Sequence, residues 1–145
     1  LKKLFFTMPR IKLKLPKTYH FETILSLRVY DMNYGAHMGN DSVLSIVHEA
    51  RVQFLNSLNL TERNFYGFSL LMADSAVVYK KEAFYGDELN IKIAVSELYN
   101  YGFELFYFIT HNNFEIARVK TGMVCYDREN NKIKRIPDYF LNSFS

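Results

Sequence analysis

Residues 28–58 read RVYDMNYGAHMGNDSVLSIVHEARVQFLNSL, and the rest of the chain is organised around them. An extended run ends at Tyr30, and a loop with glycine at positions 35 and 39 follows from residue 31 to residue 40. The next residues predict an amphipathic helix, because apolar side chains recur at steps of three and four; these are Val43, Ile46, Val47, Ala50, Phe54 and Leu58. Strand, loop and helix together bring four polar side chains near one helix N-terminus: Asp31, Asn33, His37 and Glu49.

The helix has a second, polar face. Asn40 or Asp41 can cap its start by accepting a hydrogen bond from an unpaired backbone N–H. The polar side chains lie within roughly 80° of one another at 3.6 residues per turn; they are Ser42, Ser45, Glu49, Gln53 and Asn56. One face of the helix therefore enters a core, and the Glu49 face meets water, a ligand or another chain.

Length and composition predict one globular domain. We expect a flexible extension at 1–8 and a single domain at 9–145, with 49% hydrophobic and 23% charged residues as in soluble proteins. A net charge of +3 is too small to indicate nucleic acid, and no apolar run has the roughly 20 residues of a membrane helix. The single cysteine, Cys125, excludes an internal disulfide, and neither a metal-site spacing nor a phosphate-loop motif occurs. We therefore expect a cytoplasmic protein with no cofactor, no metal, and no membrane or nucleic-acid partner.

The remaining sequence predicts mainly antiparallel strands. Residues 9–17 alternate basic and apolar side chains as an extended arm, and the first strand covers residues 20–30. Four further strands follow the helix as a meander at 69–84, 89–95, 103–110 and 114–126, with a hairpin turn at Gly86-Asp87, and a short helix follows Pro137. One helix cannot cover both faces of such a sheet, so a homodimer is expected.

Several motifs together resemble a known family. The run DMNYGAHMGN at 31–40, EAR at 49–51, YKKEA at 79–83, YGDEL at 85–89 and ARVKTG at 117–122 resemble the 4-hydroxybenzoyl-CoA thioesterase-like family of acyl-CoA thioesterases. The resemblance implies an α+β hotdog fold, in which an antiparallel sheet of about five strands wraps around one long central helix and dimerises through the sheet. It also implies a homodimer or homotetramer that hydrolyses a fatty or aromatic acyl thioester of coenzyme A or of an acyl carrier.

The resemblance also implies roles for individual residues. Asn33 stands where many members carry a catalytic aspartate, whereas His37 and Glu49 match the histidine and glutamate of acyl-carrier-protein thioesterases. Backbone N–H groups at the helix start would polarise the thioester carbonyl; these belong to Met38, Gly39 and Asn40. Glu49 would activate water as a general base, with His37 orienting that water or sharing the role and Asn33 holding it. Asp31 is assigned to substrate binding, and Asp74 is a second candidate acid.

Basic residues would hold the coenzyme A phosphates. Lys80 and Lys81 are the first candidates, together with Arg118 and Lys120, and a second group is Lys132, Lys134 and Arg135. Each of these residues has a structural alternative: Asp31 and Asn33 as turn residues, His37 as a structural hydrogen-bonding residue of the loop, Asp74 as a buried, paired acid, and Glu49 and the basic side chains as solvated surface. Two other functions stay open, a hotdog dehydratase or hydratase and a non-catalytic acyl-CoA-binding protein, which Asn33 favours.

Overall fold

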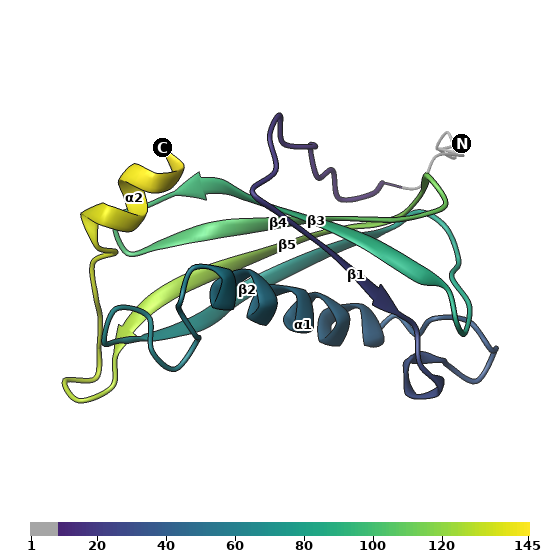
Figure 1. The fold of residues 1–145 in the computed structure, drawn as a ribbon, viewed down its shortest axis with the longest axis horizontal. Helices are drawn as coiled ribbons and strands as arrows, with labels where there is room; N and C mark the ends of the chain where they lie inside the picture. Colours follow the sequence, from purple (N-terminus) through teal and green to yellow (C-terminus); the bar gives the residue numbers. More distant parts are fainter. Residues whose placement is uncertain (1–8) are drawn as a thin grey trace, which may run out of the picture.

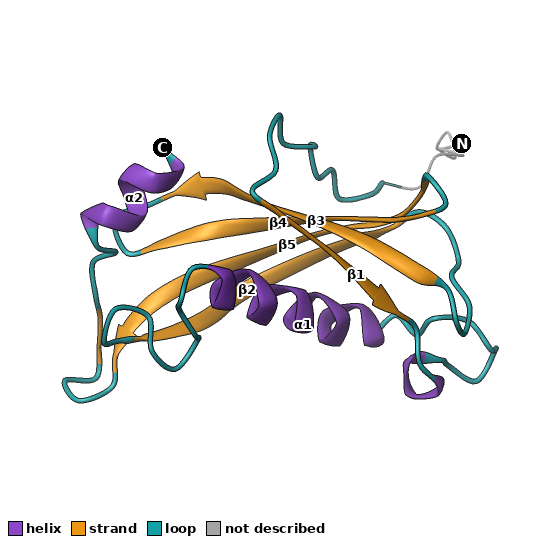
Figure 2. Ribbon diagram, viewed as in Figure 1, coloured by secondary structure: helices purple, strands orange, loops and turns teal. Residues whose placement is uncertain are grey.

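The computed structural model describes residues 9–145, so the expected extension at 1–8 lies outside the described part. The chain forms β1 (Phe21–Ser26), a 3-10 turn η1 (Val29–Asp31), α1 (Ser42–Ser57), β2 (Ser69–Tyr79), β3 (Glu88–Leu98), β4 (Gly102–His111), β5 (Phe114–Asp127), β6 (Lys132–Ile133) and α2 (Asp138–Phe144). Figure 1 and Figure 2 show α1 lying along one face of a twisted antiparallel sheet. The α+β class is confirmed, and the 16 residues of α1 correspond to the helix predicted after the loop.

The order of the strands differs from the predicted meander. Neighbouring strands follow the order β1-β3-β4-β5-β2, with β6 added to β5, and every pair is antiparallel. The hairpin predicted between β2 and β3 is wrong, because Gly86 and Asp87 bond to the end of β1 instead: Gly86 N–H donates to Leu27 O and Leu27 N–H donates to Asp87 O. β2 therefore lies at the edge of the sheet beside β5.

Two strands end earlier than predicted. β1 stops at Ser26, because the Asp31 carboxylate accepts a hydrogen bond from the Arg28 N–H at 2.7 Å and holds residues 29–31 in a tight turn. β2 stops at Tyr79 rather than Phe84, and the N–H groups of Lys80 and Lys81 both turn to the carbonyl of Ile116. Both early ends leave loop residues free to surround the start of α1.

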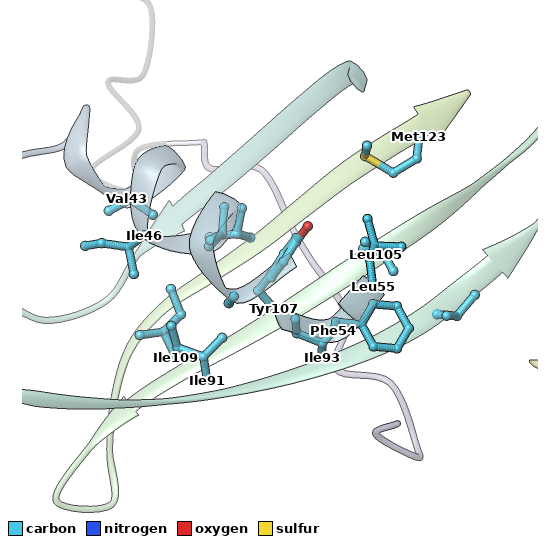
Figure 3. Packing of buried hydrophobic residues seen from close by; sticks show 14 of the residues in the cluster. Val43, Ile46, Phe54, Leu55, Ile91, Ile93, Leu105, Tyr107, Ile109 and Met123 are labelled. Atoms are coloured by element: carbon cyan, nitrogen blue, oxygen red, sulfur yellow. The ribbon is translucent and has the colours of Figure 1, made fainter. Parts of the chain in front are cut away.

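The core lies between α1 and the inner face of the sheet. Apolar side chains of the helix pack on alternating residues of the central strands (Figure 3); the buried members include Val43, Val47, Phe54, Ile91, Ile93, Leu105, Tyr107, Ile109 and Val119. Because strand side chains alternate between faces, Lys120 and its cross-strand neighbour Phe106 point to the opposite, outer face. Residues 9–14 lie against that outer face, where Arg118 Nη1 donates to Leu13 O at 2.8 Å. Within residues 9–145, neither helix has the length and apolar character needed to cross a membrane.

Candidate active site

The loop from Asp31 to Asn40 is closed by the side chain of Asn33. The side-chain Oδ1 accepts hydrogen bonds from the backbone N–H of Gly35 at 2.9 Å and of His37 at 3.2 Å. The backbone N–H of Asn33 donates to His37 O at 2.7 Å. An asparagine that bonds the backbone two residues on stabilises such a turn. Asn33 therefore shapes the loop that carries His37.

His37 faces a carboxylate that the sequence analysis did not assign to the site. Its Nδ1 is shielded from solvent and lies 3.2 Å from Glu82 Oε2, although within residues 9–145 it makes no well-directed hydrogen bond. The ring also packs on Phe84, with 5.0 Å between ring centroids. The segment after β2 thus forms one wall of the site, and Nε2 is the ring nitrogen left to meet a ligand. Glu82 could have been noticed in the YKKEA motif, but nothing local to the sequence links it to residue 37.

The N–H groups at the start of α1 differ in availability. The N–H of Met38 donates to Ala83 O at 2.8 Å, and that of Gly39 donates to Asp31 O at 2.9 Å. The N–H groups of Asn40 and Asp41 have no acceptor among residues 9–145. Any anionic oxygen held by this helix start would therefore meet Asn40 and Asp41, one position further along than the sequence suggested.

Asp31 and Glu49 line one open cleft of about 330 Å³ between the end of β1, η1 and α1. The cleft is lined by Leu25, Ser26, Arg28, Asp31, Ser45, Ile46, His48, Glu49 and Val52. Asp31 is buried and bonded to Arg28, whereas Glu49 is exposed and its Oε1 accepts a hydrogen bond from Gln53 Nε2 at 2.9 Å. The hydrogen bond and charge of Asp31, and more weakly the charge of Glu49, raise the pKa of Arg28. Of the two acids, Glu49 is the one free to act on a ligand.

Asp41 directly precedes α1, eight residues before Glu49. At about 1.5 Å of rise per residue, Glu49 is roughly 12 Å along the axis from Asp41. That distance leaves room for a thioester group and a water molecule between the helix start and the carboxylate. Asn33 and His37 are not among the residues that line the cleft with Glu49. The loop and the cleft therefore lie on two different sides of the helix start.

Asp74 lies away from both the loop that carries His37 and the cleft that Glu49 lines. It is on the outer face of the sheet, where its carboxylate accepts hydrogen bonds from Lys120 Nζ at 2.8 Å and from the Gly122 N–H at 3.1 Å. The hydrogen bond from Lys120 is the main cause that lowers the pKa of Asp74. A Cβ at Gly122 would lie 2.4 Å from Asp74 Oδ1, so a larger residue there would displace the carboxylate from this contact. Asp74 is therefore a paired surface acid on the opposite face from α1.

The two candidate lysines point to different neighbours. Lys80 lines a hollow between the arm at 9–14 and the sheet. The Lys81 ammonium lies 3.6 Å from the centre of the Phe114 ring, a cation–π contact. Only Lys80 therefore joins a cationic cavity.

A buried polar network joins α1 to the sheet. Arg51 is 5% exposed, and its Nε donates to Glu62 Oε1 at 2.6 Å while Nη1 donates to the Tyr107 hydroxyl at 3.2 Å. Burial acts to raise the pKa of Glu62, but the hydrogen bonds from Arg51 and His48 outweigh it and lower that pKa. The network satisfies a buried charge and fixes the helix on the sheet. Within the described residues, no three His, Cys, Asp or Glu side chains converge to hold a metal ion.

The sequence belongs to the thioesterase-like superfamily. The model of that family matches residues 27–144, which include the loop, α1 and all strands after it. The resemblance to hotdog acyl-CoA thioesterases is thus confirmed, and thioester hydrolysis is the enzyme class that this membership supports. No curated protein matches the sequence significantly.

Solved structures of named thioesterases share the fold. A 1,4-dihydroxy-2-naphthoyl-CoA thioesterase from Synechocystis superposes with a TM-score of 0.77 at 20% identity, covering 86% of this chain and 94% of that one. A gentisyl-coenzyme A thioesterase gives 0.77 at 15% identity, covering 86% and 100%. A DHNA-CoA thioesterase from Staphylococcus aureus gives 0.75 at 18% identity, covering 84% of each chain. At these identities the likeness concerns the fold.

Proposed function

We propose that this protein hydrolyses an acyl-CoA thioester, with Glu49 as the general base. The observation that carries the proposal is the exposed Glu49 carboxylate in an open cleft beside α1, together with the N–H groups of Asn40 and Asp41, which lie just before the start of the same helix and have no acceptor among residues 9–145. Thioester hydrolysis needs a polarised carbonyl and an activated water. The N–H groups just before α1 can supply the first, and Glu49 on α1 can supply the second.

The carbonyl oxygen would be held by the N–H groups of Asn40 and Asp41. The helix start carries about half a positive charge, which stabilises the negative oxygen that forms as water attacks. One such donor is worth roughly 3 kcal/mol of barrier. Since a thiolate leaves readily, no strong acid is required opposite the base.

His37 would assist from the loop. The contact of its Nδ1 with Glu82, at 3.2 Å, would orient the ring. Nε2 would then face the ligand and position the water or the thioester. The solved neighbours named for naphthoyl and gentisyl thioesters support including aromatic acyl groups beside fatty ones in a substrate panel.

A second candidate function is acyl-CoA binding without turnover. It is favoured by Asn33, which offers no carboxylate and whose Oδ1 is engaged by two backbone N–H groups. In that case substrate would bind along α1 and remain intact.

We further propose that the protein acts as a homodimer or a dimer of dimers. β2 has 11 residues, pairs on one side only among residues 9–145, and presents Met72 with 46% of its surface exposed. A long unpaired edge strand is a template for another strand, and a second copy of this chain is the proposed occupant.

The experiment is a comparison of Glu49→Gln with Glu129→Gln on a panel of acyl-CoAs, using a free-thiol reagent. Gln keeps the shape of Glu49 and its contact with Gln53, so the fold should survive. Loss of a general base should lower kcat by at least about 10²-fold with little change in KM. Glu129 is exposed in the turn after β5, so its variant should match wild type. Equal kcat values for both variants would remove Glu49 from the mechanism, and release of no thiol by wild type would favour the binding function.

A further inference from the structure

A cationic hollow lies on the outer face of the sheet. It has a volume of about 780 Å³ and is formed by residues 9–14 together with Val78, Lys80 and Arg118. Five of its lining residues are basic and none is acidic: Arg10, Lys12, Lys14, Lys80 and Arg118. Small-molecule sites in proteins typically measure roughly 300–1,000 Å³.

The arm is attached to the sheet through carbonyl oxygens rather than carboxylates. Arg118 donates to Leu13 O at 2.8 Å, and Arg10 donates to Tyr79 O. Of the five basic side chains, only Arg118 forms an ion pair within the described residues, with Glu115. Residues 1–21 of the sequence contain six basic residues and no Asp or Glu, so the arm brings no carboxylate of its own. Within the described residues the hollow is therefore lined by basic side chains without an acidic one, and the carboxylates of Glu97 and Glu104 line the adjoining hollow that Lys12 and Lys14 also border.

The cluster of basic side chains and the concave shape of the hollow together favour the binding of a small polyanion. Clustered Lys and Arg side chains bind phosphate oxygens through charge-assisted hydrogen bonds, and a concave wall strengthens their combined field. The concave shape fits a compact ligand better than the flat surface of a membrane.

The hollow also adjoins the candidate active site through one residue. Tyr79 accepts the Arg10 bond on its carbonyl, and its hydroxyl donates to Asn40 O at 2.9 Å, at the start of α1. A long ligand could therefore reach around the edge of β2 from one to the other. We propose that the hollow binds a phosphate-bearing ligand; given the proposed function, its occupant is the nucleotide end of coenzyme A.

The test is calorimetric titration with adenosine 3′,5′-bisphosphate, which carries the phosphates but no thioester, with adenosine as the uncharged comparison. Wild type should bind the bisphosphate and not adenosine, and added salt should weaken binding by screening. Lys80→Gln and Lys12→Gln should each raise Kd about tenfold, equivalent to about 1.4 kcal/mol. Arg63→Gln makes the same charge change at an exposed position between α1 and β2, outside the hollow, and should leave Kd within about twofold.

Each outcome decides the proposal. Absence of bisphosphate binding, or an equal loss of affinity in Arg63→Gln, would overturn it. Inorganic phosphate binding as tightly as the bisphosphate would support the anion site and overturn its assignment to coenzyme A. Because the probe lacks a thioester, the result stands whether or not the protein proves to be a hydrolase.

Discussion

Substitutions of Asn33 test whether this residue only stabilises the turn or also acts on the ligand. Asn33 Oδ1 accepts two backbone N–H groups, at 2.9 and 3.2 Å. Asn33→Asp keeps an oxygen at that position and adds negative charge near a helix start, where the dipole favours it. Asn33→Ala removes both bonds, at about 1 kcal/mol or less for each in an exposed loop. The alanine variant should therefore lose about 1–2 kcal/mol and about 3–6 °C in Tm, while the aspartate variant matches wild type.

The assays are urea unfolding and kcat on the best acyl-CoA. If Asn33 acts only by shaping the loop, kcat should fall in the same order as stability. Wild type and Asn33→Asp should be highest and equal, Asn33→Ser intermediate and Asn33→Ala lowest. Serine serves as the matched intermediate because its hydroxyl forms the same kind of turn more weakly.

Three results would refute this reasoning. An Asn33→Ala variant as stable as wild type would show that the two hydrogen bonds do not hold the loop. An equally stable Asn33→Asp variant whose kcat falls about tenfold would give the Asn33 amide a direct role. A wild type without turnover that gains hydrolysis with aspartate would establish the non-catalytic binding protein instead.

Three further outcomes are expected. Glu62→Gln should cost about 3 kcal/mol in urea unfolding, since it leaves the buried Arg51 charge unpaired. The pKa of Glu62 is lower in the folded state than in the unfolded state. The stabilisation from its charge is therefore complete above the unfolded pKa of about 4.3 and is lost as pH falls through the folded value. The difference in free energy of unfolding between wild type and Glu62→Gln should shrink between pH 6 and pH 3. Gly102→Ala should cost about 1–3 kcal/mol, because its Cβ would lie 2.2 Å from the Met123 carbonyl oxygen, and unchanged stability would contradict that close approach. Light scattering should find a dimer or tetramer, and a stable folded monomer at micromolar concentration would disprove the proposed assembly.

The sequence by itself determined the local elements around residues 28–58. The apolar spacing of α1, the glycine-containing loop and the alternation in β3 are local patterns, and each appears where it was predicted. The same patterns, through their order, identified the family that the comparison then confirmed. Local spacing suffices for these features because helix and strand periodicity are properties of neighbouring residues.

Only the tertiary structure decided which distant segments meet. β2 pairs with β5 instead of β3, and His37 meets Glu82, because residues 80–87 bond to the end of β1 and to β5. Asp74 likewise turned out to lie on the outer face, beside Lys120. Such contacts depend on how the helix and the sheet bury their apolar faces against each other. The residues around a side chain in the sequence therefore do not indicate which distant segment it will meet.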